Sequence, residues 1–237
     1  MTDSAVRLVS VLPALLGTYG DGGNVRVLSQ RLVWRGMDVE VVTVGAGDPV
    51  PTSGDLYVLG GGEDDAQVAA LEALRGSGLA SAASAGAAML VVCAGLQILG
   101  ESLELNGGRR VAGLGLLDLV TDRLPKRALG ETVTECDPAL GLPPITGFSN
   151  HGGGTRLGPA ARPLGRVVSG PGNAGDGDAD EGVLQGSVLG SYLHGPLLAR
   201  NPALADLLLA RAVGGPLPEL PPGPAEVLHR ERLDSQR

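Results

Sequence analysis

The chain has 237 residues, of which 43% are hydrophobic, and a formal net charge of −8 from 26 acidic and 18 basic residues. With a single Phe and a single Trp, this composition predicts one globular domain with an aliphatic core. The acidic balance argues against a nucleic-acid partner, because nucleic acids repel negative charge. No apolar run approaches the roughly 20 residues of a membrane-spanning helix, and residues 1–13 lack a secretory pattern. We therefore expect a cytoplasmic protein without membrane insertion.

Short apolar runs alternate with helical patterns along the first 105 residues. Strands are predicted over 6–13, 38–44, 55–62 and 87–93, and helices over 23–36, 64–78 and from residue 94 onward. This alternation is typical of parallel strands joined by crossover helices, so the sequence predicts an α/β fold. The later patterns are shorter and richer in strands, until a helix is predicted over 201–213. We expect one domain over 1–213 and a loose, proline-rich surface tail over 214–237.

One cysteine stands where a predicted strand gives way to a predicted helix. Cys93 ends the apolar run 87–93 and precedes Ala94 and Gly95 in "VVCAGLQ". In an α/β sheet, such a turn presents its side chain at the carboxyl edge, where ligands bind. The N-terminus of the next helix is expected to lower the thiol pKa, and the Ala94 amide could stabilise an oxyanion. Cys93 is therefore a predicted nucleophile, although an arbitrary cysteine is more often a small buried hydrophobic residue.

A cysteine nucleophile also needs an imidazole and a second oxyanion donor. Gly61 or Gly62, in "LGGGEDD" after another predicted strand, could supply the donor. Among the three histidines, His194 ends the last apolar strand, where a parallel sheet could bring it to the same edge as the cysteine. His151 could as well hydrogen-bond a loop, and His229 lies in a polar tail where we expect it in solvent. We predict His194 as the base, with a structural histidine at a strand end as the alternative.

Taken together, these motifs resemble class I glutamine amidotransferases. "VVCAGLQ" is similar to their nucleophile elbow, "LGGGEDD" to their oxyanion strand and "SYLHGPLLARNP" to their histidine segment. "GTYGDGGNVRVLSQRLVWRG" and "GFSNHGGGT" narrow the resemblance to the cobyric-acid-synthase-like branch and, within it, to the glutaminase subunits of lipid II isoglutaminyl synthase, the GatD family. The resemblance implies a three-layer, flavodoxin-like fold with a mostly parallel central sheet. It also implies hydrolysis of glutamine through a thioester on Cys93.

The sequence departs from the family pattern at two positions. Val91 stands where most class I enzymes have Gly, and Pro196 stands where the familiar triad has a glutamate, two residues after the histidine. Cys93 and His194 must therefore work without that carboxylate or receive one from elsewhere, for instance from a partner subunit.

Substrate glutamine carries a carboxylate and an ammonium group that must be held. The segment "TDRLPKRALGE" offers Arg123, Lys126 and Arg127, and a guanidinium fork suits a carboxylate best. We prefer Arg127, because its spacing from the cysteine resembles that of the family's glutamine-binding arginine. Arg123 is the second choice, and a solvated loop charge is the alternative. Gln97 and Asn150 either orient the site or are satisfied structural residues.

No cofactor or metal ion is expected in this chain. Two cysteines and three histidines match no zinc-binding spacing, and no G-x-x-x-x-G-K-[ST] motif is present. Since amidation of a carboxylate needs ATP, we expect ATP and Mg²⁺ on a separate synthetase. The resemblance implies a Mur-ligase-like partner, MurT, and lipid II as the acceptor, whose D-glutamate carboxylate is amidated. The glycine-rich "GTYGDGGN" is expected to face that partner rather than a nucleotide.

Three alternatives remain open at this point. A cobyric or cobyrinic acid amidotransferase would share the site, but that family carries its ATP-binding domain on the same chain. A freestanding, peptidase-like cysteine hydrolase would act alone on peptides or small amides. A binding module without activity is disfavoured, because Cys93, His194 and both glycine turns occur together.

Overall fold

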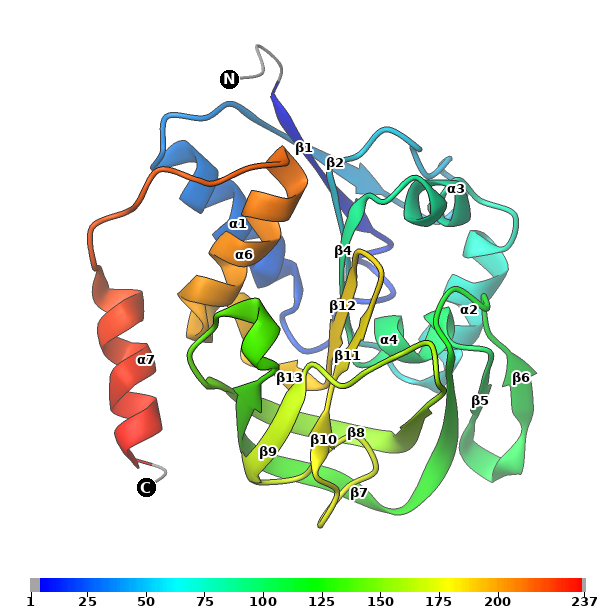
Figure 1. The fold of residues 1–237 in the computed structure, drawn as a ribbon. Helices are drawn as coiled ribbons and strands as arrows, with labels where there is room; N and C mark the ends of the chain where they lie inside the picture. Colours follow the sequence, from blue (N-terminus) through cyan, green and yellow to red (C-terminus); the bar gives the residue numbers. More distant parts are fainter. Residues whose placement is uncertain (1–4, 236–237) are drawn as a thin grey trace.

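A computed structural model describes residues 5–235, which form two sheets and the helices around them (Figure 1). The first sheet has the strand order β11-β12-β4-β3-β1-β2, and only its β11–β12 pair is antiparallel. Its strands are β1 (Val6–Val11), β2 (Val39–Val44), β3 (Leu56–Leu59), β4 (Ala88–Val92), β11 (Val183–Gln185) and β12 (Val188–Ser191). The predicted α/β fold with a mostly parallel central sheet is confirmed.

Helices cover both faces of this sheet, which gives the three predicted layers (Figure 1). One face carries α1 (Gly22–Val33) and α6 (Pro202–Val213), and the other carries α2 (Asp64–Leu74), α3 (Leu79–Ser84) and α4 (Ala94–Leu99). Every residue of β3 and β4 is buried, as expected of continuous apolar runs covered on both sides. The aliphatic core of the molecule therefore lies around these central strands.

The second sheet lies at the carboxyl ends of the parallel strands (Figure 1). Its strands are β5 (Ser102–Glu104), β6 (Arg110–Ala112), β7 (Leu119–Cys136), β8 (Ile145–Leu157), β9 (Gly165–Ser169), β10 (Asp180–Glu181) and β13 (Leu193–His194). The long strands β7 and β8 pair antiparallel, and β13 pairs with β8 so that His194 lies opposite Phe148. Two short 3-10 helices, Asn106–Gly108 and Pro138–Leu140, flank this sheet. The sheet thus closes over the edge where Cys93 was expected.

Three local expectations differ from the structure. The predicted helix 64–78 ends at Leu74, because the turn that follows it contains Gly76 at φ 67°, and α3 begins after it. The tail is not loose throughout, since helix α7 (Pro224–Ser235) packs near α5 (Leu197–Arg200), α6 and β8. His229 of α7 is buried rather than solvated, and its Nδ1 donates to the Arg200 carbonyl at 2.8 Å. The division into a domain over 1–213 and a tail stays a prediction.

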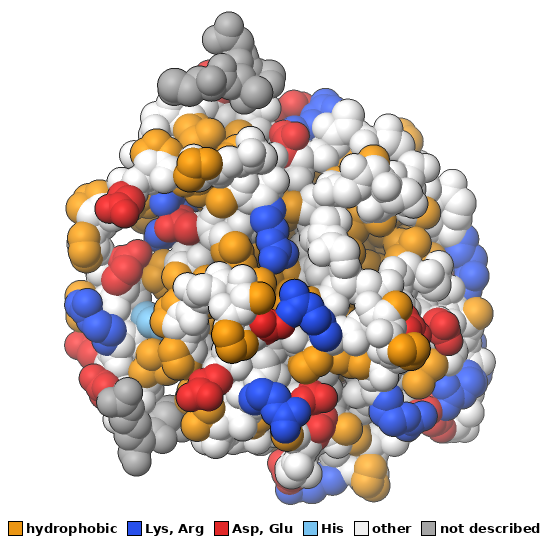
Figure 2. Space-filling model, viewed as in Figure 1, with side chains coloured by type: hydrophobic (Ala, Val, Ile, Leu, Met, Phe, Trp, Pro, Cys, Tyr) orange, Lys and Arg blue, Asp and Glu red, His pale blue; other side chains and the backbone are white. Residues whose placement is uncertain are grey.

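The surface carries both signs of charge. Figure 2 shows Lys and Arg side chains interspersed with Asp and Glu across the viewed face, with no large area of one sign. Within residues 5–235, no helix is long and apolar enough to cross a membrane.

Candidate active site

Cys93 occupies a strained turn between β4 and α4. Its φ of 51° and ψ of −106° place a non-glycine residue in a sparsely populated backbone region, as expected of a nucleophile elbow. Two hydrogen bonds hold the turn: Cys93 N donates to the Ser191 carbonyl at 2.9 Å, and Gly95 N donates to the Gly60 carbonyl at 3.0 Å. A Cβ at Gly95 would lie 2.9 Å from the Leu59 carbonyl oxygen. Glycine is therefore required where α4 meets the end of β3.

The thiol is held in its protonated form, which contradicts the expectation of a lowered pKa. Burial raises the pKa of Cys93 to about 12, and the nearby Asp21 carboxylate raises it further, while the Ala94 amide acts in the opposite direction. The predicted benefit of the helix N-terminus is therefore outweighed by the loss of solvent around the buried sulfur. A base must remove this proton during attack.

His194 is oriented by a carboxylate of the same chain. Its Nδ1 lies 3.1 Å from Asp21 Oδ1, and both side chains are buried. Because a carboxylate accepts, Nδ1 is the donor, and Nε2 has no hydrogen-bond partner within residues 5–235. Asp21 thus places a carboxylate of the same chain on His194, although Pro196 stands where the family has its glutamate.

Sequence reasoning missed Asp21, although a signal was present. Asp21 lies in "GTYGDGGN", between β1 and α1, which is the same carboxyl edge of the parallel sheet that presents Cys93. The prediction that this loop faces a partner overlooked its only buried acid. Tyr19 lies in the same loop, and the centroid of its ring is 4.7 Å from the centroid of the His194 ring.

The two predicted oxyanion glycines have different surroundings. Gly61 N donates to Asp21 Oδ2 at 2.8 Å, so this amide is already occupied. A Cβ at Gly61 would lie 2.9 Å from the His194 ring, which explains why glycine is needed there. Gly62 lines the cavity that contains Cys93. Gly62, with the Ala94 amide, is therefore the better candidate for the oxyanion site.

The cavity over Cys93 measures only about 20 Å³, enough for about one water molecule. It brings together most of the predicted site residues, although they come from segments distant in sequence. Its lining consists of Tyr19, Gly62, Glu63, Asp64, Gln67, Cys93, Gln97, Arg123, Arg127, Asn150, His151, Gly152 and Gly153.

Of the cationic candidates, Arg127 is held at the mouth of this cavity. Its Nε donates to Asn150 Oδ1 at 2.6 Å and its Nη2 donates to the Tyr19 hydroxyl at 2.8 Å. Asn150 therefore orients the guanidinium. Lys126 pairs with Asp176 and is 82% exposed, so it does not contribute to the lining.

The inner wall of the cavity is a hydrogen-bonded network. Gln97 accepts from Gln67 Nε2 at 2.9 Å and donates to the Tyr192 hydroxyl at 3.0 Å, so its amide is satisfied within the protein. The Tyr192 ring stacks on His151 with centroids 3.8 Å apart. Burial lowers the pKa of His151 to about 4, and its Nδ1 donates to the Gly153 carbonyl at 2.7 Å. His151 is therefore neutral near pH 7 and forms part of the wall.

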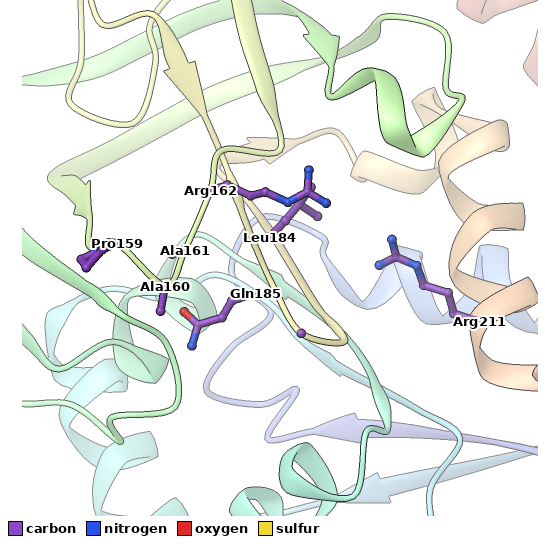
Figure 3. A pocket seen from close by; sticks show the side chains of 8 residues that line it. Pro159, Ala160, Ala161, Arg162, Leu184, Gln185 and Arg211 are labelled. Atoms are coloured by element: carbon purple, nitrogen blue, oxygen red, sulfur yellow. The ribbon is translucent and has the colours of Figure 1, made fainter.

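A larger cavity, of about 210 Å³, lies elsewhere (Figure 3). Its lining is Pro159, Ala160, Ala161, Arg162, Leu184, Gln185, Gly186 and Arg211. None of these side chains is a nucleophile or a base suited to amide hydrolysis, so size does not identify the active site here. Across the described chain, no three His, Cys, Asp or Glu side chains cluster as a metal site.

Comparisons with known proteins agree with this geometry. Residues 7–202 match the model of the CobB/CobQ-like glutamine amidotransferase domain. The chain is 36% identical to the lipid II isoglutaminyl synthase subunit GatD of Staphylococcus aureus over 83% of this chain and 80% of that protein. It is 32% identical to the subunit GatD of Streptococcus pneumoniae over 84% of this chain and 77% of that protein.

Two further similarities place the chain more broadly. It is 34% identical to the cobyric acid synthase of Sphingopyxis alaskensis over 73% of this chain but only 35% of that protein. A crystal structure of a glutamine amidotransferase, 23% identical, shares the fold with a TM-score of 0.60 over 86% of this chain and 98% of its own. The chain therefore belongs to the CobB/CobQ-like family and is a class I glutamine amidotransferase domain.

Proposed function

We propose that this chain is the glutaminase subunit of a lipid II isoglutaminyl synthase. It hydrolyses L-glutamine to glutamate and supplies the ammonia to a MurT-like ligase, which amidates the D-glutamate of the lipid II stem peptide during peptidoglycan synthesis. The observation that carries the glutaminase activity is the Asp21–His194 hydrogen bond beside the strained Cys93. The similarity to the two GatD subunits supports the choice of acceptor.

The first half of the reaction acylates the enzyme. Because burial keeps the Cys93 thiol protonated, His194 Nε2 accepts the proton as the sulfur attacks the carboxamide carbon. A C–S bond forms, and the carbonyl oxygen becomes an oxyanion that the amides of Ala94 and Gly62 stabilise. Asp21 stabilises the imidazolium and keeps its Nδ1–H in place.

The second half releases both products. Collapse of the oxyanion breaks the C–N bond, and His194 returns the proton to the departing nitrogen, so that ammonia leaves. Water then attacks the thioester while His194 takes one of its protons. The C–S bond breaks, the sulfur regains its proton from His194, and glutamate is released.

Ammonia is then used by a different protein. We expect ATP and Mg²⁺ on the MurT-like ligase, in the cytoplasm, with no cofactor needed by the glutaminase site itself. The chain matches the GatD subunits over most of their length and cobyric acid synthase over about a third of its length, which favours the GatD role. A cobyrinic or cobyric acid amidotransferase, or a freestanding amidohydrolase, is the alternative.

The decisive experiment measures glutamate release by the purified chain alone and with increasing amounts of a MurT-like ligase. Amidation of lipid II is followed in parallel with ATP. We expect the ligase to raise the glutaminase rate, because the cavity over Cys93 is too small for glutamine and must open. Lipid II should be amidated only when both proteins and ATP are present.

Each alternative predicts a different outcome. Strong glutaminase activity that no ligase alters would favour a freestanding amidohydrolase. Amidation of a cobyrinic acid substrate, in place of lipid II, with the corresponding synthetase would favour the cobyric branch.

A further inference from the structure

Two ion pairs line the cavity over Cys93, and they differ in how they are held. Arg127 Nη2 lies 3.6 Å from Glu63 Oε1, and Arg123 Nη1 lies 3.5 Å from Asp64 Oδ1. Asp64 also accepts from Asn106 N at 2.6 Å, and the Arg123 backbone N donates to a carboxylate of β5, so this second pair is part of the wall. The side chains of Arg127 and Glu63 are 40% and 60% exposed. The first pair is therefore the more exposed of the two, since the side chains of Arg123 and Asp64 are 33% and 19% exposed.

Tyr19 joins the two members of the exposed pair. Its hydroxyl donates to the Glu63 carboxylate in a short hydrogen bond and accepts from Arg127 Nη2 at 2.8 Å. Its ring packs against His194, directly beside the catalytic residues. Arg127, Tyr19 and Glu63 thus form a bridge across the mouth of a cavity of about 20 Å³. Because this cavity is too small for glutamine, we expect the bridge to open when glutamine binds.

Opening the bridge separates Arg127 from Glu63, so that Glu63 loses its cationic partner while Arg127 keeps its hydrogen bond to Asn150. A ligand with a carboxylate alone would satisfy Arg127 but leave Glu63 unpaired beside the bound anion, which disfavours binding. A free α-amino acid carries both charges on groups attached to the same Cα and can replace both halves of the pair. The internal ion pair is then exchanged for two pairs with the ligand.

We propose that Glu63 binds the α-ammonium group of free L-glutamine while Arg127 binds its α-carboxylate. The pair then selects a free α-amino acid over peptide-bound glutamine or a simple amide. This assignment rests on the proposed glutaminase function and names the residue that recognises the second charge of its substrate. The Arg123–Asp64 pair stays closed in this scheme, which assigns the carboxylate to Arg127 rather than to Arg123.

The test compares two ligands that differ only in the ammonium group. Binding of L-glutamine and of glutaramate, which lacks the α-amino group, is measured by calorimetry with the full chain in a Cys93→Ala background, so that no turnover occurs. Glu63→Gln should weaken L-glutamine binding by about 10- to 100-fold and leave glutaramate binding unchanged or stronger. Arg127→Gln should weaken binding of both ligands.

The matched control is Glu72→Gln, an exposed glutamate on helix α2, which begins directly after Glu63, and it should change neither affinity. Thermal unfolding of each variant checks that the fold is intact. Equal weakening of both ligands by Glu63→Gln, or unchanged L-glutamine affinity, overturns the assignment. A separate result, L-glutamine that binds but is never hydrolysed by the unmutated chain with its ligase, overturns the proposed function instead.

Discussion

The backbone of Cys93 is strained and its thiol is buried, and both properties have consequences for catalysis. Residues in such backbone regions cost on the order of 1–3 kcal/mol each, so the surrounding hydrogen bonds must hold the turn. Burial removes the thiolate from the resting site, since it raises the thiol pKa to about 12. A base must therefore take this proton when the sulfur attacks, and His194 is the proposed acceptor.

Replacing the nucleophile should abolish activity without unfolding the chain. In Cys93→Ala, no thioester can form, and we expect glutamate release to fall to the level of the uncatalysed reaction. Cys136→Ala is the matched control, because Cys136 lies at the end of β7 and does not line the cavity. Steady-state glutaminase assays and thermal unfolding of both variants provide the measurement. Normal turnover by the Cys93 variant would rule out the mechanism.

Asp21 should matter for the rate rather than for binding. Asp21→Asn keeps the size of the side chain but removes the charge that stabilises the imidazolium, so we expect kcat to fall by about 10²- to 10⁴-fold with little change in KM. Asp38→Asn, at an exposed position, should leave both constants unchanged. Steady-state measurement of kcat and KM for L-glutamine in both variants tests this prediction. If kcat is retained in Asp21→Asn, another group supplies the third carboxylate.

Among the elements, α7 is attached to the domain through a charged cluster on α1. Arg31 is buried, and its guanidinium binds Asp206 of α6 at 2.7 Å and Glu226 of α7 at 3.3 Å. Arg35 also contacts Asp206, at 2.9 Å. Three helices that are distant in sequence therefore meet at one arginine. The proline-rich segment between α6 and α7 gave no sign of this packing.

Loss of this arginine should destabilise the fold. Arg31→Ala leaves Glu226 without its arginine and Asp206 with Arg35 alone, and we expect the free energy of unfolding to fall by about 2–4 kcal/mol. Arg26→Ala, an exposed position on the same helix, should change it by less than about 0.5 kcal/mol. Urea unfolding of both variants measures the difference. Equal stability of the two variants would show that α7 docks without this cluster.

For the whole molecule, two buried groups give opposite dependences of stability on pH. Burial raises the pKa of Glu181 from 4.5 to about 7, although Ser191 Oγ and Tyr192 N donate to it. The folded chain binds more protons here, so the stabilisation is complete below pH 4.5 and is lost as pH rises through 7. Burial lowers the pKa of His151 from 6.5 to about 4. Between pH 4 and 6.5 the unfolded chain binds more protons at this residue, so the contribution of His151 to the free energy of unfolding increases with pH.

Replacing Glu181 should isolate its own contribution to the pH dependence of stability. Relative to the unmutated chain, Glu181→Gln should gain stability as pH rises from 4.5 to 7, by up to about 3 kcal/mol, and show no further change above pH 8. Glu135→Gln, at an exposed position on β7, should show no such trend. Urea unfolding at pH 5, 6, 7 and 8 gives the comparison. A stability difference independent of pH would mean that Glu181 ionises in the folded chain as it does in the unfolded one.

The sequence by itself determined the elements of the parallel sheet and the turn that carries Cys93. These are local features, because the alternation of apolar runs, helical patterns and glycines repeats over short stretches. It also indicated His194 and Arg127, through motifs whose residues lie close together in the chain. The antiparallel β7–β8 pair and the docking of α7 could not be seen in this way, because they depend on contacts between distant segments.

Only the tertiary structure decided how the site works. Asp21 and His194 are 173 residues apart in sequence, and no spacing rule connects them. The same is true of the bridge that Tyr19 forms between Arg127 and Glu63. The thiol pKa was predicted in the wrong direction, because the sequence indicates the helix that follows Cys93 but not the burial around it. Burial and the pairing of distant charges arise only when the chain has folded, and here they govern the protonation of the nucleophile and the orientation of its base.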